Sequence, residues 1–155
     1  MKKLLIAICV SFTFLANAVI IPAKAETVST TYIEEVFEDG TFIEVTIEED
    51  VTLARSSTKS GTKTKSCKKS NGDVLWSIKV HGTFSYDGTT ASCTKASYTT
   101  TLSDDYWELS NAKSWKSGAT AYASVVAKEY TMLGYLLQTR TETVSLTCSA
   151  TGVLS

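Results

Sequence analysis

Apolar and polar side chains alternate over most of the chain, which is the pattern of strands that bury one face. The clearest example runs from Val74 to Tyr86. Its even-numbered positions are apolar apart from Gly82, and its odd-numbered positions are polar apart from Leu75. This alternation predicts a strand in a sheet that is covered on one side only.

Turn dipeptides flank this strand and predict its partners. Asn-Gly precedes it at positions 71–72 and Asp-Gly follows it at positions 87–88, and both pairs tolerate the positive φ angles of a tight hairpin turn. Two-residue loops would set Cys67 opposite Trp76 and Cys93 opposite Gly82. Both thiols would then face the core.

The same alternation predicts four later strands. One of them would place Lys95 in the core, so we expect a bulge there that turns Ala96 and Tyr98 inward. The segment 119–132 is rich in alanine and also fits a helix, although its valines and tyrosines favour a strand. The predicted strands cover residues 89–102, 107–115, 119–132 and 135–148.

The segment 26–54 has its own turn signal, Asp39-Gly40. A two-residue loop there would set Glu35 opposite Glu44, and like charges disfavour that pairing. We therefore expect either an ordered edge hairpin or a loosely held acidic arm. Residues 55–66 are rich in Ser, Thr and Lys and are typical of a linker.

The first 25 residues have the three-part layout of a secretory signal. Lys2 and Lys3 precede an apolar stretch, and Ala-Lys-Ala at positions 23–25 forms a cleavage site. A membrane anchor is the alternative, because apolar residues continue to Ile21. Cleavage leaves 130 of the 155 residues, the length of one domain. We expect a secreted protein, extracellular or associated with the cell wall.

Charge is distributed unevenly along the processed chain. The segment 26–54 holds nine acidic residues and no basic one, and the net charge without the signal is −4. This balance argues against a nucleic-acid binder. The acidic segment either folds back on the basic stretch that follows or leaves it free to contact an anionic wall polymer. The candidate polyanion contacts are Arg55, Lys59, Lys63, Lys65, Lys68 and Lys69.

No catalytic constellation is recognisable. The one histidine, His81, lies on the polar face of its strand, and no phosphate-binding loop or nucleophile elbow is present. Asp104 and Asp105 adjoin aromatic residues, as in glycoside chemistry, but adjacent acids on one loop rarely flank a bond. We expect no enzyme activity, no metal and no cofactor, and we keep a glycan-acting hydrolase as a lesser alternative.

Aromatic residues supply the other candidate site. Trp107 and Trp115 share strand parity, with Tyr106 beside them. These rings could face a glycan or peptide ligand, or the tryptophans could close the core, which is the interpretation we favour. Trp76 is predicted to be a core residue.

Short stretches along the processed chain carry a resemblance to other proteins. They are residues 38–44, 55–61, 74–77, 82–88, 116–118 and 144–150. Together these stretches resemble a family of short, uncharacterised secreted proteins of Gram-positive bacteria, a domain of unknown function. The resemblance implies export and a single β-rich unit in which Cys93 and Cys148 form a matched pair, and it implies no activity. Cys67 departs from the pattern and would be a buried free thiol.

A disulfide between Cys93 and Cys148 is therefore expected, and it would stabilise the fold by roughly 4 kcal/mol in the chain-entropy model. We predict an all-β, antiparallel β-sandwich of about seven strands over residues 55–155, immunoglobulin-like in architecture. Leu146 stands where immunoglobulin domains place a corner tyrosine. The predicted role is a non-enzymatic extracellular binding module, whose partner could be a cell-wall polymer or glycan. A secreted toxin or membrane-active protein is the alternative.

Overall fold

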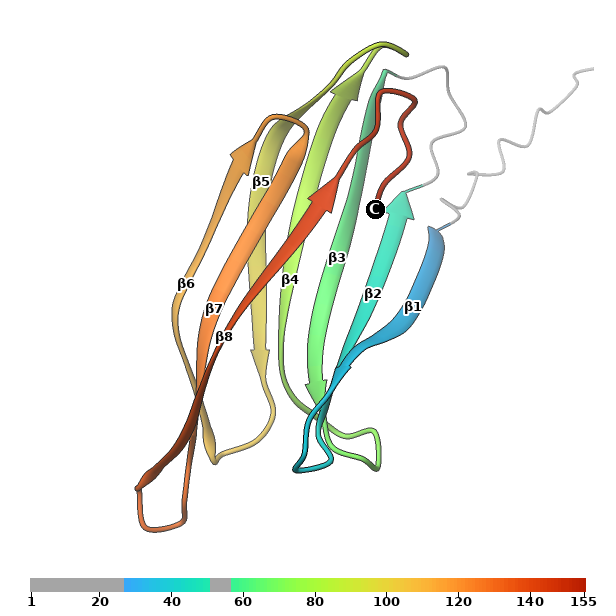
Figure 1. Ribbon diagram of the computed structural model, residues 1–155. Helices are drawn as coiled ribbons and strands as arrows, with labels where there is room; N and C mark the ends of the chain where they lie inside the picture. The colour runs from blue at the N-terminus through green and yellow to red at the C-terminus, as the bar shows by residue number, and fades with distance from the viewer. Residues whose placement is uncertain (1–26, 51–56) are drawn as a thin grey trace, which may run out of the picture.

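The computed structural model describes residues 27–50 and 57–155, which form strands and turns in two antiparallel sheets (Figure 1). The predicted signal, residues 1–25, and Arg55 lie outside the described residues. The strands are β1 (Thr27–Val36), β2 (Phe42–Asp50), β3 (Thr58–Lys68), β4 (Val74–Tyr86), β5 (Ala91–Leu102), β6 (Trp107–Ser117), β7 (Thr120–Tyr130) and β8 (Leu136–Thr147).

The predicted all-β sandwich is confirmed. One sheet has the order β1-β2-β3-β4-β5 and the other the order β6-β7-β8, so neighbouring strands are always consecutive in sequence. Immunoglobulin domains instead use Greek-key connections. The likeness to them is therefore one of two-layer architecture, and each sheet is an up-and-down meander.

The N-terminal hairpin is an integral part of the larger sheet. Strand β2 pairs with β3 from Phe42 opposite Lys68 to Glu49 opposite Gly61. A register shift in β1 sets Glu35 opposite Ile43, which removes the like-charge pair that a regular hairpin would create. Of the two expectations for this segment, the ordered edge hairpin is the one that the structure contains.

The prediction of a linker over residues 55–66 is wrong for its described part. Residues 58–68 form β3, which pairs with β2 on one side and β4 on the other. Serine, threonine and lysine are tolerated in this central strand because carboxylates on other strands pair with its lysines. The composition of this segment favours a linker, but pairing with β2 and β4 makes it a strand.

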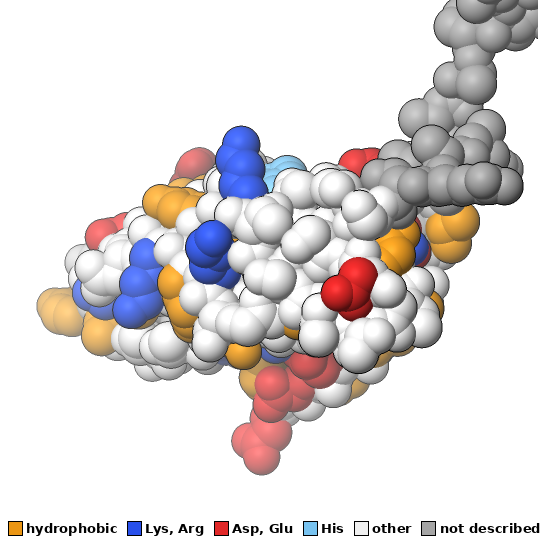
Figure 2. Space-filling model, turned by 90° about the horizontal axis from the view of Figure 1, so that it is seen from above, with side chains coloured by type: hydrophobic (Ala, Val, Ile, Leu, Met, Phe, Trp, Pro, Cys, Tyr) orange, Lys and Arg blue, Asp and Glu red, His pale blue; other side chains and the backbone are white. Residues whose placement is uncertain are grey.

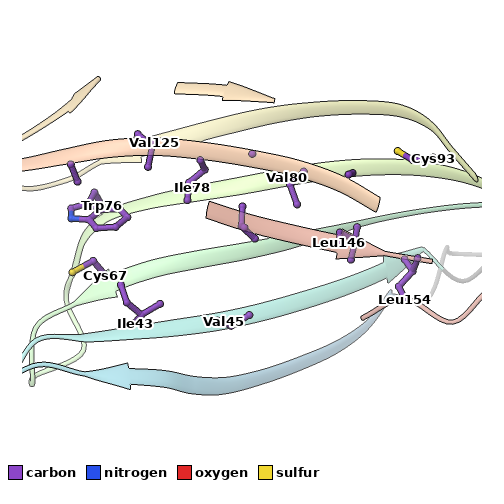
Figure 3. Close-up of a cluster of buried hydrophobic side chains, with 14 of the residues drawn as sticks. Ile43, Val45, Cys67, Trp76, Ile78, Val80, Cys93, Val125, Leu146 and Leu154 are labelled. Atoms are coloured by element: carbon purple, nitrogen blue, oxygen red, sulfur yellow. The ribbon is translucent and has the colours of Figure 1, made fainter. Parts of the chain in front are cut away.

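The core lies between the inner face of the larger sheet, including β2, β3 and β4, and the smaller sheet (Figure 3). Trp76, Ile78, Val80 and Phe84 of β4 are fully buried, as the alternation predicted. They meet the alanines and Val125 of β7, where the strand assignment for residues 119–132 is confirmed over 120–130. Small side chains on β7 allow the two sheets to approach closely.

Neither predicted two-residue turn is present. At the first turn the Lys69 N–H donates to Asp73 O at 2.9 Å, and a register shift between Cys67 and Lys68 restores the expected pairing of Cys67 with Trp76. At the second turn Asp87 donates its N–H to Thr90 O at 3.1 Å, which makes a longer connection. Cys93 is therefore opposite Phe84 and not Gly82. The shift is two residues, so Cys93 keeps its inward orientation and is buried.

The bulge expected near Lys95 is present. The register shifts between Thr83 and Phe84 of β4, so that Lys95 is opposite Thr83 and Ala96 is opposite Gly82. Ala96 packs against the core, as predicted. The prediction that Tyr98 also turns inward is wrong, because its side chain is 40% exposed on the edge strand β5.

Within residues 27–50 and 57–155, no helix has the length and apolar character needed to cross a bilayer.

Candidate functional site

The β7–β8 hairpin carries the main exposed apolar cluster at one end of the sandwich. We call this cluster the apolar tip. Met132 and Leu133 are the most exposed large hydrophobic side chains in the described part of the chain, at 85% and 82%. The hairpin projects beyond the other turns at its end of the molecule (Figure 1). Hydrophobic side chains gather at this extremity in the view from above (Figure 2). The tip consists of Met132, Leu133, Tyr135, Leu136 and Leu137.

Thr131 organises the turn at the tip. Its N–H donates to Tyr135 O at 2.8 Å, and its carbonyl accepts the Gly134 N–H at 2.9 Å. Its hydroxyl oxygen accepts the N–H groups of Leu133 at 3.3 Å and Tyr135 at 3.1 Å. Gly134 has φ +79°, which favours glycine. Four backbone N–H groups are thus bonded within the turn, and its shape is set before any partner arrives.

The exposed apolar side chains extend from the turn into the start of β8. Leu136 lies opposite Tyr130 and Gln138 lies opposite Glu129, so Leu137 is the extra residue of a bulge. Leu136 is 55% exposed and Leu137 is 60% exposed. The tip therefore has apolar surface both on its turn and on the first residues of β8.

Arg140 anchors the base of the hairpin to the larger sheet. Its guanidinium lies over the Phe37 ring, 3.7 Å from the ring centroid, and its Nη2 is 3.0 Å from Asp39 Oδ2. Its Nη1 donates to Thr41 Oγ1 at 3.2 Å. Hydrogen bonds from Thr41, together with the Arg140 charge, hold the pKa of Asp39 below its usual value. The charges at the base are therefore paired.

The connection between β5 and β6 supports the same base. Tyr106 O accepts the N–H of Tyr130 at 2.8 Å. The Tyr106 side chain is exposed, so this predicted ligand-facing aromatic residue lies next to the tip. On the other strand Gln138 donates a hydrogen bond to the Glu129 carboxylate. Polar groups at the base thus satisfy one another.

The predicted aromatic strip does not form. Trp107 is 4% exposed and lies 5.9 Å from Trp76 between ring centroids, so it belongs to the core. Trp115 is 39% exposed and stacks on Tyr122 with 5.1 Å between centroids. A bulge in β6, where Asn111 has φ 53°, reverses the parity between the two tryptophans. The favoured core interpretation therefore holds for Trp107 and is wrong for Trp115.

The predicted polyanion contact is not free. Four of its lysines pair with carboxylates of the fold, so the acidic segment folds back on the basic stretch. Burial lowers the pKa of Lys63, the fifth described member. The pairs are Lys59 with Glu49 at 2.5 Å, Lys65 with Glu34 at 2.5 Å and with Glu142 at 3.3 Å, Lys68 with Glu44 at 2.5 Å, and Lys69 with Asp104 at 2.9 Å.

The three described cysteines are free and buried. The N–H of Cys93 donates to Gly118 O at 2.8 Å, and the N–H of Cys148 donates to Ala119 O at 3.0 Å. Two cysteines from different sheets thus bind adjacent residues of the β6–β7 turn. Burial raises the pKa of both thiols. Burial also raises the pKa of Cys67, to about 11.

Of the residues considered for hydrolysis, Asp104 has structural contacts and Asp105 is exposed in the same turn. Asp104 accepts the N–H of Tyr106 at 3.0 Å and pairs with Lys69 at 2.9 Å. The Lys69 hydrogen bond lowers the pKa of Asp104, whereas a general acid needs a raised one. His81 Nε2 is 3.1 Å from Thr99 Oγ1 on the polar outer face of the larger sheet.

Sequence reasoning assigned strands to both arms of the β7–β8 hairpin and overlooked its tip. A signal was available in the sequence. No charged residue lies between Glu129 and Arg140, and the alternation breaks into apolar doublets at 132–133 and 136–137. Consecutive apolar residues on either side of a turn glycine cannot all face one core.

No family model matches the chain, and no curated sequence or solved structure gives a significant match. The resemblance to short secreted proteins therefore stays a prediction.

Proposed function

We propose that this chain is an exported, non-enzymatic module that attaches to the cell envelope through the apolar tip. The observation behind the proposal is a preformed hairpin end whose large apolar side chains are 55–85% exposed. Contiguous exposed apolar surface marks interaction sites in proteins that otherwise bury such groups. The sandwich would act as a rigid holder for this contact.

The size of the apolar tip indicates a reversible attachment. Burial of one large aliphatic side chain contributes about 1.5–3 kcal/mol. Four of the five side chains are aliphatic, and we expect them to be covered incompletely, which gives roughly 6 kcal/mol in total. That energy corresponds to weak to moderate affinity after the costs of association are included. A protein held this way would exchange between the envelope and the medium.

The other candidate functions have less support. A wall-polymer contact through the basic stretch would require breaking the ion pairs of Lys59, Lys65 and Lys68. A hydrolase would require an acid with a raised pKa, and Asp104 has a lowered one. A secreted membrane-active protein remains the second candidate, because it would use the same apolar tip.

The proposal includes a disulfide between Cys93 and Cys148 in the exported protein. It is supported by the backbone hydrogen bonds that bring both residues to the β6–β7 turn from opposite sheets. Two thiols lose two protons and two electrons as the sulfur–sulfur bond forms, and an external disulfide oxidant accepts the electrons. The bond would cross-link the sheets at the end opposite the tip.

Envelope attachment is tested with purified protein that lacks residues 1–25 and retains every described residue. The protein is mixed with isolated cell envelopes at low and high salt, and the retained fraction is measured. We expect retention that salt does not weaken, and at least a fivefold loss in the variant Leu133→Ser/Leu137→Ser.

The matched control replaces exposed apolar residues outside the tip. Val28 and Val153 are both exposed, and Val28→Ser/Val153→Ser removes the same class of side chain. This variant should be retained like the unmodified protein. Equal retention of the tip variant and the control variant would overturn the proposal.

A further inference from the structure

We infer that the apolar tip contacts the interfacial region of a lipid bilayer, an inference that rests on the proposed attachment. The distribution of apolar side chains favours this partner over a protein. Met132 and Leu133 are exposed at the end of a hairpin that projects beyond the other turns at this end of the molecule, and Leu136 and Leu137 are exposed behind them (Figure 1). The apolar surface therefore lies on a projecting end and not on a flat or concave face of the sandwich. A bilayer surrounds an inserted hairpin from every side.

Four backbone N–H groups of the tip are already hydrogen-bonded within the turn. Unsatisfied N–H and C=O groups are costly in hydrocarbon, so inserted segments must bond them internally. Thr131 bonds three N–H groups of the turn through its carbonyl and hydroxyl oxygens, and its own N–H donates to Tyr135 O. These bonds reduce the number of backbone N–H groups that insertion would leave without a partner.

Charge is absent from the part that would insert. Residues 130–139 contain no ionisable acid or base other than tyrosine. The next charges along the chain are Glu129, bonded by Gln138, and Arg140, paired with Asp39. Insertion of residues 130–139 alone therefore desolvates no charged side chain.

Tyrosines lie at the level where the hairpin would enter the interface. Tyr135 is in the tip, and Tyr106 is exposed beside the base of the hairpin. Tyrosine is enriched at membrane–water interfaces because its ring is apolar and its hydroxyl is polar. A strand rises about 3.3 Å per residue, so a tip of three residues per arm spans roughly 10 Å. That length reaches the boundary between headgroups and acyl chains and does not cross the bilayer.

The paired charges at the base also predict which lipids are bound. Because Arg140 is neutralised by Asp39, and Lys69 by Asp104, this end offers few free cations to anionic headgroups. Binding should therefore be driven by apolar burial and should need no anionic lipid. High salt should leave it unchanged.

Vesicle flotation tests the inference with the protein that lacks residues 1–25. Phosphatidylcholine vesicles are compared with vesicles that also contain phosphatidylglycerol, at low and high salt. We expect similar binding to both, and at least a tenfold weaker apparent affinity for Leu133→Ser/Leu137→Ser. The Val28→Ser/Val153→Ser control should bind like the unmodified protein. Equal binding of tip and control variants, or a requirement for phosphatidylglycerol, would overturn the inference.

Depth is measured with Tyr135→Trp, whose added fluorescence should shift to the blue with vesicles and be quenched by lipids brominated near the headgroup. An encapsulated dye should stay inside the vesicles, and its release would contradict shallow docking.

The two proposals fail separately. Tip-dependent retention on envelopes without binding to pure lipid would overturn the lipid inference alone, whereas tip-independent retention would overturn the attachment itself.

Discussion

The guanidinium of Arg140 lies over the ring of Phe37, with 3.7 Å between its central carbon and the ring centroid. This contact joins β8 of the smaller sheet to the turn after β1 of the larger sheet. The same guanidinium pairs with Asp39 at 3.0 Å and lies 5.6 Å from the Trp107 ring. One side chain thus closes the sandwich at the base of the apolar tip.

Replacement of Arg140 by lysine should destabilise the protein, although the charge is kept. Lysine lacks the planar group that can lie over Phe37 while it donates to Asp39 and Thr41. We expect a loss of about 1–2 kcal/mol in the free energy of unfolding, measured by urea denaturation. The Phe37→Leu variant should lose less, and Arg140→Lys should cost little in that background. Unchanged stability of Arg140→Lys would show that the contact is incidental.

The missing side chain of Gly82 makes room for the Phe84 ring. A Cβ at position 82 would lie 2.5 Å from that ring and 3.2 Å from the Cβ of Ala121 on β7. Gly82→Ala should therefore cost about 1–3 kcal/mol through overpacking of the core. The double variant Gly82→Ala/Phe84→Leu should lose less stability than the sum of the two single losses, because the smaller leucine leaves room for the added Cβ. Additive losses in a thermal unfolding series would contradict this account.

Two carboxylates predict lower stability in acid. Hydrogen bonds from Thr62 and Lys79 hold the pKa of Glu48 below its ordinary value of 4.5, and Thr41 does the same for Asp39. The folded state thus binds fewer protons than the unfolded state, so stability is complete above the ordinary pKa values and falls as the pH drops below them.

The melting temperature from pH 6 to pH 2 measures this loss. Glu48→Gln/Asp39→Asn should start less stable at pH 6 and decline less steeply in acid than the unmodified protein. Parallel curves for the two proteins would mean that these carboxylates do not drive the acid response.

Cys67 should be inert in the folded protein. Its thiol is fully buried and its pKa is about 11, so thiolate is scarce at pH 8. A chromogenic disulfide reagent should detect no Cys67 thiol until denaturant is added. The Cys67→Ser variant supplies the control, because it should lack the thiol that unfolding exposes. Fast labelling of native protein would contradict the burial.

The pairing of the other two cysteines is checked on secreted protein by peptide mapping without reduction. We expect one cross-linked pair, Cys93 with Cys148, and one free cysteine. In Cys93→Ser the Cys148 thiol should become free and the melting temperature should fall, since a closed loop of this length is worth roughly 4 kcal/mol. Any linkage through Cys67 would refute the pairing.

The sequence alone determined the strand character of the chain and the inner face of β4. Burial of every second residue is a local property, so Trp76, Ile78 and Val80 could be placed in the core from their spacing. The turn signal before β4 also gave the correct partner of Cys67, Trp76, although a register shift had to offset a turn longer than the one predicted. The bulge near Lys95 could also be predicted, because a regular strand would have buried the charge of that lysine.

Only the tertiary structure decided the features that depend on distant residues. Strand β3 resembles a linker because the carboxylates that pair with its lysines lie elsewhere, among them Glu142 of β8. The bulge at Asn111 turned Trp115 outward, and no local pattern marks it. Burial is a relation between segments, so the apolar side chains of the tip look like core in the sequence. They are exposed because the hairpin extends past every strand that could cover it.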